Sequence, residues 1–306
     1  MSRILITGSV GLVGRALRSA LAVRDCEVVG LDLRAPEPER GDVRDPPRVD
    51  SAVRGCAGII HLAAVSRVVW AERDPEACRS INVDGLGHVL DAAERQPRPP
   101  WVIFASSREV YGQAAAFPVT ETAELSPLNV YGRSKERGES LVGEARARGL
   151  RAAVVRLSNV YGSTWDHVDR VIPAFARAAV RAEPLRVEGA NHTFDFTHLD
   201  DTVRGLVALI DLLDRGREAP TPIHLLTGQP TTLGELAELA VALARSRAPI
   251  TFAPPRTFDV ESFHGDPRRA QEVLGWAPRV PLRDGLARLI EEIRVEIGAG
   301  NNEVLA

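Results

Sequence analysis

A tyrosine and a lysine four residues apart, Tyr131 and Lys135, are the residues of this sequence best suited to acid–base chemistry. On a helix this spacing places both side chains on one face. A lysine about 5 Å from the phenol would stabilise the phenolate by roughly 3 kcal/mol and move a pKa near 10 towards about 7–8. Such a phenolate could take the proton of a substrate alcohol while hydride leaves the same carbon for a nicotinamide cofactor.

A serine pair, Ser106 and Ser107, follows an apolar run at Trp101–Ala105 that predicts a buried strand. Ligands bind beyond the carboxyl ends of such strands, so Ser107 can hydrogen-bond the reacting oxygen. The alternative is that both serines only cap a turn. We predict that Ser107 acts with the tyrosine and the lysine, and that Glu109 is a further catalytic candidate.

A glycine-rich turn follows the first predicted strand, Arg3–Thr7, and opens a helix predicted at Leu12–Val23. Its glycines, Gly8, Gly11 and Gly14, have the spacing Gly-x-x-Gly-x-x-Gly. Bare backbone and the positive end of a helix can together receive a pyrophosphate. Glycine triplets alone are weak signals, but the strand, turn and helix around this one favour a dinucleotide site.

Asp32 ends the second predicted strand, Glu27–Asp32, 18 residues after Gly14. At that position it can accept hydrogen bonds from the adenosine ribose hydroxyls. It would repel the 2′-phosphate of NADP by roughly 4 kcal/mol at about 4 Å and an effective dielectric near 20. Arg34, just beyond the strand, is the kind of group that accommodates that phosphate, which keeps NADP as the alternative. We predict NAD as the cofactor.

Short apolar runs alternate with helical stretches through the first half, which is the pattern of a parallel sheet covered by helices. Further strands are predicted at Gly58–Leu62 and Ala152–Leu157. After residue 157 the alternation weakens and prolines become frequent. Further helices are predicted at Pro75–Arg95, Tyr131–Arg148 and Asp200–Leu213.

These elements predict an α/β protein with two lobes. The first is a Rossmann-type doubly wound parallel sheet, formed by residues 1–157 and about 193–215, that binds NAD. The second is a smaller C-terminal α/β lobe that binds the substrate, formed by residues about 158–192 and 216–306.

Composition excludes several other classes of protein. A formal net charge of −3 over 306 residues gives no general attraction for nucleic acid. The chain has no run of about 18 uncharged apolar residues, and it reaches a glycine too early for a secretory signal, so we expect a cytoplasmic protein that does not span a membrane. Cys26, Cys56 and Cys78 have neither metal-ligand spacing nor disulfide density. We expect reduced thiols, no metal and a small-molecule partner.

Several short motifs accompany these residues. They are Gly41-Asp42-Val43-Arg44-Asp45, His61-Leu62-Ala63-Ala64, Asn82-Val83, Val110-Tyr111-Gly112 and Asn159-Val160-Tyr161-Gly162. Together with the glycine turn, the serine pair and Tyr131-x-x-x-Lys135, the series resembles the extended short-chain dehydrogenase/reductases. Within them it resembles the NAD-dependent epimerase/dehydratase family, which acts on nucleotide sugars. The resemblance spans nearly the whole chain.

The resemblance implies a role for each matching residue. Ser107, Tyr131 and Lys135 would form the catalytic triad, and Tyr131 and Lys135 would also contact the cofactor. A homodimer would form through the helices at Leu86–Ala93 and Lys135–Val142. The remaining residues implied at the cofactor are Leu12, Val13, Leu33, Asp42, Val43, Leu62, Ala63, Ala64 and Ser158, and those implied at the substrate are Asn159, Val171, Ile172 and Arg256.

Two positions depart from the family pattern. Phe194 stands where the family usually has an arginine that clasps the diphosphate, so one charge-assisted contact worth about 1.5–3 kcal/mol is missing. Arg108 stands where family dehydratases have an aspartate. Its guanidinium, with a pKa above 12, is no proton donor, so we expect Arg108 to pair with an acid or to hold a substrate carboxylate. We therefore predict no 4,6-dehydration.

The leading prediction is an NAD-dependent nucleotide-sugar epimerase that works through a transient keto sugar. A decarboxylase or 4,6-dehydratase of the same family is the alternative, with Glu109 as the discriminating residue. A sugar ketoreductase or dehydrogenase comes next. A catalytically silent NAD-binding regulator belongs to a different class, and the intact Ser107, Tyr131 and Lys135 argue against it. The sugar and its nucleotide stay open.

Overall fold

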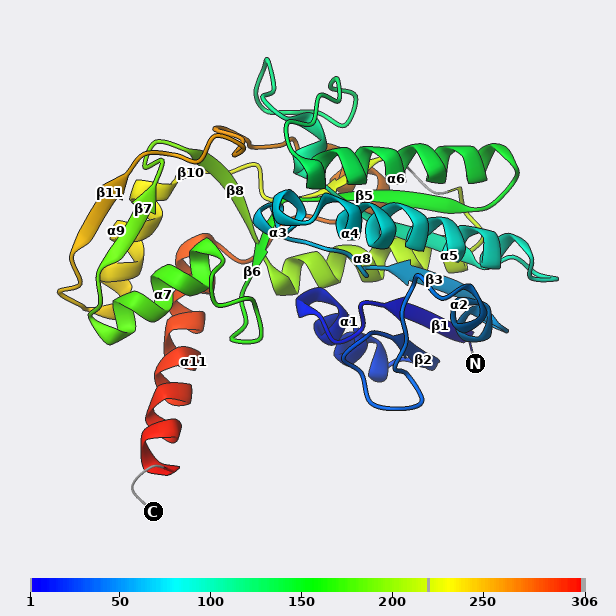
Figure 1. The fold of residues 1–306 in the computed structure, drawn as a ribbon, viewed down its shortest axis with the longest axis horizontal. Coiled ribbons are helices and arrows are strands. Elements are labelled where there is room, and N and C mark those ends of the chain that lie inside the picture. The colour runs from blue at the N-terminus through cyan, green and yellow to red at the C-terminus, as the bar shows by residue number, and fades with distance from the viewer. Residues whose placement is uncertain (1, 219–220, 304–306) are drawn as a thin grey trace.

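The computed structural model, which describes residues 2–218 and 221–303, shows two lobes side by side (Figure 1). The larger lobe contains a six-stranded sheet in the order β2-β1-β3-β4-β5-β9, and all of its neighbouring strands run parallel. Because β2 and β3 lie on opposite sides of β1, the carboxyl ends of these strands border the crevice where open α/β sheets bind ligands. The strands are β1 Ser2–Thr7, β2 Cys26–Leu31, β3 Gly58–His61, β4 Trp101–Ser107, β5 Ala152–Leu157 and β9 Ile223–Leu225.

Helices cover both faces of this sheet, as its Val- and Ile-rich strands require. One face packs against α1 (Leu12–Ala22) and α8 (Leu199–Asp214). The other face packs against α2 (Pro46–Val53), α5 (Gly85–Glu94) and α6 (Val130–Ala147). The predicted doubly wound architecture is confirmed.

The smaller lobe has two short sheets and its own apolar core. In the first sheet β8 lies between β6, which runs parallel to it, and β10, which runs antiparallel. Three helices pack together around this core, and α11 extends away from the body of the protein in Figure 1. The elements are β6 Asn159–Tyr161, β7 Leu185–Glu188, β8 Thr193–His198, β10 Pro230–Thr232, β11 Ile250–Ala253, α7 Val171–Arg181, α9 Leu233–Ala244 and α11 Leu282–Glu303.

The chain crosses between the lobes more often than we predicted. β9 is an edge strand of the large sheet, and α10 (Arg268–Leu274) packs against β9 and α8. Part of the segment after residue 216, predicted in the smaller lobe, therefore lies in the larger one. Conversely β8, predicted in the larger lobe, pairs with β6 in the smaller one. A strand of three residues such as β9 carries too little hydrophobic pattern to be assigned to a sheet beforehand.

The helix predicted over Pro75–Arg95 is interrupted. Between α4 (Pro75–Arg79) and α5 the chain forms one π-helical turn, Ser80–Asp84. The side chain of Asn82 in this turn accepts a hydrogen bond from the Val65 amide and donates to Ser134. Single π turns of this kind occur frequently at functional sites. Short helices outside the predicted ranges include α3 (Val68–Arg73) and the 3₁₀ turn Arg108–Tyr111.

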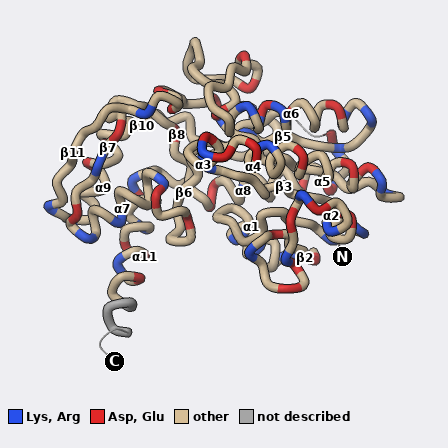
Figure 2. Tube along the Cα trace, in the orientation of Figure 1, with Lys and Arg blue, Asp and Glu red and all other residues tan. Residues whose placement is uncertain are grey.

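Charge is distributed evenly over the molecule. Figure 2 shows Lys and Arg interspersed with Asp and Glu along both lobes. Within residues 2–218 and 221–303, no helix is long and apolar enough to cross a membrane. The three cysteines, all among the described residues, form no disulfide with one another.

Gly138 allows α6 to lie close against β4. A Cβ atom added at Gly138 would stand 2.5 Å from Cζ of Phe104, a buried β4 residue, and 3.2 Å from Cδ2 of Leu86 on α5. Real Cβ atoms do not approach other atoms so closely. The contact matters for function because α6 also carries Tyr131 and Lys135.

We predict that Gly138→Ala lowers the free energy of unfolding by about 1–3 kcal/mol, since the overpacked ring and helix must move apart. The matched control is Gly143→Ala on the same helix, where an added Cβ would meet nothing within 4 Å. That change should stabilise the protein by about 0.5–1 kcal/mol, as Ala does over Gly in a helix. Urea unfolding measures both, and equal effects would show that the approach of α6 to β4 is not sterically limited.

Candidate active site

Two clefts meet at the carboxyl ends of β4 and β5. The larger has a volume of about 570 Å³ and the smaller about 340 Å³. Ser107, Tyr131 and Ser158 line both clefts. All residues predicted at the cofactor line the larger cleft, and all those predicted at the substrate line the smaller one. Their individual roles stay predictions.

The glycine turn forms one end of the larger cleft. Gly8 has a φ of +70°, and a Cβ at Gly14 would stand 2.3 Å from the Gly8 carbonyl oxygen, so side chains are excluded from both positions. Gly11 is the N-cap residue of α1, and among the described residues no side chain caps this end of the helix. The first amides of α1 are thereby open to an anion. These features fit the pyrophosphate of a dinucleotide.

Asp32 links the glycine turn to the end of β2. Its carboxylate accepts hydrogen bonds from the Val10 amide at 3.1 Å and from the Arg34 amide at 2.9 Å. The Arg34 side chain is 65% exposed, and its Nε lies 3.8 Å from Asp32. A fixed carboxylate with further lone pairs fits ribose hydroxyls rather than a phosphate.

The catalytic candidates converge where the clefts meet. Ser107 Oγ accepts a hydrogen bond from the Glu109 amide at 3.2 Å, which leaves the hydroxyl proton free to be donated. Hydrogen bonding with Ser107 lowers the pKa of the Tyr131 phenol. Lys135 Nζ donates to the Ala105 carbonyl at 2.7 Å and lies 5.8 Å from the centre of the Tyr131 ring. The three residues are thus brought together as predicted.

The electrostatic prediction for Tyr131 was wrong for the protein alone. Burial raises the pKa of Tyr131 to about 12, and the charge of Arg170 and the hydrogen bond from Ser107 only partly oppose it. Burial also lowers the pKa of Lys135 to about 8. The predicted pKa counted only the attraction of the two charges at an effective dielectric of about 20 and left out desolvation, which favours the neutral form of each group.

Arg108 and Glu109 form a buried ion pair beside Ser107. Arg108 Nη2 lies 2.7 Å from Glu109 Oε1, and each side chain is only 9% exposed. The second carboxylate oxygen of Glu109 accepts from Asn129 Nδ2 at 2.8 Å. Asn129 Oδ1 in turn accepts from the Gly132 amide and caps α6. The prediction that Arg108 pairs with an acid is confirmed.

No role was predicted for Arg170, although it lines both clefts and its charge acts on Tyr131. Its Nε lies 3.6 Å from Asp166, a buried carboxylate whose pKa burial raises. Its position directly before Val171 was the available signal, but only the fold shows that Arg170 reaches the tyrosine. Nearby, Trp165 lies at the larger cleft with its ring 4.6 Å from Arg15 Cζ.

The far end of the smaller cleft holds Arg256 and Phe194. Arg256 Nε lies 2.8 Å from Asp259 and 3.8 Å from Glu188. Phe194 is only 8% exposed, and its ring contacts Phe196 edge-on. Asn159 lies at the same cleft, where its amide approaches the Asp195 carbonyl at 3.4 Å.

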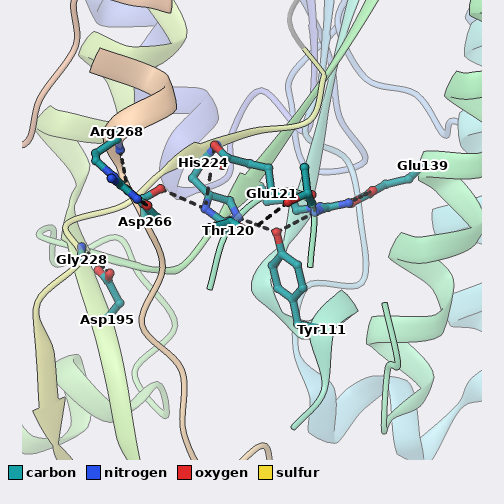
Figure 3. Close-up of polar contacts among 11 residues, drawn as sticks. Tyr111, Thr120, Glu121, Glu139, Asp195, His224, Gly228, Asp266 and Arg268 are labelled. Atoms are coloured by element: carbon teal, nitrogen blue, oxygen red, sulfur yellow. Dashed lines mark hydrogen bonds and ion pairs between the residues drawn. The ribbon is translucent and has the colours of Figure 1, made fainter. Parts of the chain in front are cut away.

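A buried polar network connects the elements that carry the catalytic residues (Figure 3). Tyr111, a buried core residue, accepts a hydrogen bond from Arg156 at its Oη and contacts His224 Nε2, each at 2.6 Å. Arg156 also pairs with Glu139, which accepts from Ser106 at 2.6 Å. The network thereby joins β4, β5 and α6 beneath the catalytic residues.

A second set of contacts in Figure 3 connects the lobes. Asp195, buried on β8, accepts from the Thr227 and Gly228 amides, which follow β9. His224 on β9 contacts the Asp266 carbonyl at 3.3 Å. β8 of the smaller lobe is therefore fixed to the edge of the larger sheet, and its Phe194 keeps its place in the smaller cleft.

Comparison with known proteins agrees with this geometry. The pattern of the NAD dependent epimerase/dehydratase family matches residues 4–221. UDP-glucuronic acid decarboxylase 1 of Arabidopsis thaliana is 29% identical over 96% of this chain and 70% of its own length. UDP-glucose 4-epimerase of Mycolicibacterium smegmatis is 29% identical over 95% of this chain and 98% of its own. The solved structure of MoeE5 in complex with UDP-glucuronic acid and NAD has a TM-score of 0.89 and 29% identity, and covers 96% of this chain and 100% of that chain.

We predict that NAD binds at least about tenfold more tightly than NADP, because the buried Asp32 carboxylate would face the 2′-phosphate. Calorimetry with both dinucleotides measures the ratio. Asp32→Ser, which removes the charge and keeps a hydroxyl acceptor, should narrow it. Equal dissociation constants for the wild-type protein would show instead that Arg34 turns to the phosphate.

Proposed function

Because this chain belongs to the NAD-dependent epimerase/dehydratase family, we propose that it is a nucleotide-sugar epimerase that inverts one sugar carbinol through a transient ketone. NAD, held by the residues of the larger cleft, would supply the hydride chemistry, accepting hydride from the carbinol and returning it to the other face of the ketone. Tyr131 takes and returns the hydroxyl proton, while Ser107 donates a hydrogen bond to the same oxygen. The positive charge of Arg170 opposes the effect of burial on the pKa of the phenol. Lys135 lies with its Nζ 5.8 Å from the centre of the Tyr131 ring.

The observation that favours epimerisation over dehydration is the state of Glu109. A dehydratase needs a free base beside the ketone and an acid for the departing hydroxyl. In the described structure both carboxylate oxygens of Glu109 already have partners, Arg108 on one side and Asn129 on the other. Inversion at a single carbon requires only Tyr131, so the engaged glutamate is no obstacle to it.

Decarboxylation of a nucleotide-linked uronate is the second candidate. It is favoured by the Arg108 guanidinium, which lines the smaller cleft and could hold a carboxylate. UDP-glucuronic acid decarboxylases are among the relatives, and so are UDP-glucuronate 4-epimerases. A carboxylate beside a transient ketone can be lost without a further base, so the products must separate the two reactions.

The test is to incubate the protein and NAD with UDP-glucuronate, UDP-glucose and dTDP-glucose and to follow products by proton NMR and mass. We expect an epimer of unchanged mass from at least one sugar.

Tyr131→Phe should lower the turnover of that sugar by at least about 100-fold and leave the affinity for NAD nearly intact. Loss of carbon dioxide would identify the decarboxylase, and loss of water would contradict the role given to Glu109.

We further propose that the protein is a homodimer. The apolar side chains of the two predicted interface stretches, among them Leu86, Leu90 and Val142, pack inside the larger lobe and are not available to a partner. The support is therefore the family resemblance, together with the position of α5 and α6 beside each other on one face of the sheet. The cytoplasmic location stays a prediction.

Light scattering at micromolar concentration should give twice the mass of the chain. We expect Ser140→Glu, which adds a charge at an exposed position of α6, to shift the mass towards the monomer. Catalytic residues are untouched by this change. A monomeric wild-type protein would remove the dimer from the proposal.

A further inference from the structure

Arg108 offers an unused hydrogen-bond donor to the smaller cleft. Among the described residues its Nη1 has no hydrogen-bond partner, although the side chain is only 9% exposed. Buried polar groups are nearly always paired, because leaving a charged donor without an acceptor is costly. Arg108 lines the cleft where the substrate is proposed to bind, so an occupant of that cleft can supply the acceptor.

The guanidinium is held in one orientation. Its Cζ lies 4.5 Å from the centre of the Phe194 ring and 5.8 Å from that of Phe263. Its Nη2 is fixed by Glu109, and Glu109 is fixed by Asn129. With the aromatic rings and the carboxylate in these places, Nη1 is a preorganised donor, which lowers the entropic cost of binding.

The other arginines of the cleft are engaged differently. Arg256 must share Asp259 and Glu188 with any ligand it binds, and Arg186 likewise pairs with Glu188. Arg108 can donate a hydrogen bond from Nη1 to a further oxygen while Nη2 stays paired with Glu109. The guanidinium of Arg108 contacts the ring of Phe194, which belongs to β8. At this position the wall of the cleft therefore has an aromatic side chain and not a charged one.

We propose that Arg108 Nη1 binds a negatively charged oxygen of the substrate, and that the Phe194 ring serves as the platform for this cation. The oxygen belongs either to the nucleoside diphosphate or to the carboxylate of a hexuronate, two sources with the same recognition chemistry. The inference rests on the proposed function for the class of ligand. It assigns the anchoring to a residue adjacent in sequence to Ser107, at the end of β4.

The decisive variant is Arg108→Met/Glu109→Gln. Arg108→Met alone would leave a buried carboxylate that repels any anion, whereas the double variant removes both charges and keeps an acceptor for Asn129. Dissociation constants of UDP, UDP-glucose and UDP-glucuronate are measured by calorimetry at saturating NAD. We expect at least about tenfold weaker binding of at least one ligand.

The three ligands distinguish the sources of the oxygen. Equal weakening of all three assigns Arg108 to the diphosphate, and selective weakening of UDP-glucuronate assigns it to the carboxylate. Unchanged affinity for all three overturns the inference. Arg108→Lys, which keeps the charge and loses the planar fork, should weaken the same ligands to a smaller degree and serves if the double variant fails to fold.

Because binding is measured without turnover, failure of this inference is separate from failure of the proposed function. A wild-type protein that forms an epimer, with Arg108 variants that bind every ligand normally, would remove only the anchoring role. A wild-type protein that binds UDP-sugars through Arg108 but forms no epimer would remove only the proposed reaction. The dissociation constant of NAD, expected to stay within about twofold, controls for the integrity of the fold.

Discussion

The start of α6 is the constraint on which the rest of the site depends, and Asn129 fixes it. Its side chain accepts from the Gly132 amide and donates to Glu109, so one residue both begins the helix and orients the acid next to it. A second side chain, Glu72, accepts from the Val130 amide at 2.7 Å. Tyr131 follows one residue later, and its position relative to Ser107 is therefore set by hydrogen bonds rather than by packing alone.

Burial shifts the pKa values of Tyr131 and Lys135 in opposite directions. Desolvation raises the pKa of Tyr131 and lowers that of Lys135, so it drives both groups towards their neutral forms. The nearby charge of Arg170 acts against this for the tyrosine. A site of this kind keeps its phenol protonated in the protein alone, and the positive charges around it must favour the phenolate when the reaction begins.

Much of this arrangement follows from local sequence. The glycine turn, Asp32 and the Tyr131–Lys135 spacing predict correctly which residues meet, since each depends on the end of a strand or on one helical face. The role of Arg170 and the position of β9 could not be predicted, because both depend on how the segments after residue 157 pack against the larger lobe. The π turn at Ser80–Asp84 could not be read either, because its reason, the contact of Asn82 with Ser134, spans 52 residues. The pKa of Tyr131 depends on burial, which residue spacing does not report.

The two clefts that meet at Tyr131 are lined largely by different parts of the chain. The wall of the larger cleft comes mostly from the first strands and turns of the sheet, and much of the wall of the smaller one comes from segments after residue 157. Substitutions among the later residues that line only the smaller cleft can change its shape and charge without altering the wall of the larger one. Phe194 lies in such a segment. The interior of the smaller cleft can therefore be reshaped by single substitutions at such positions, with the glycine turn and Lys135 unchanged.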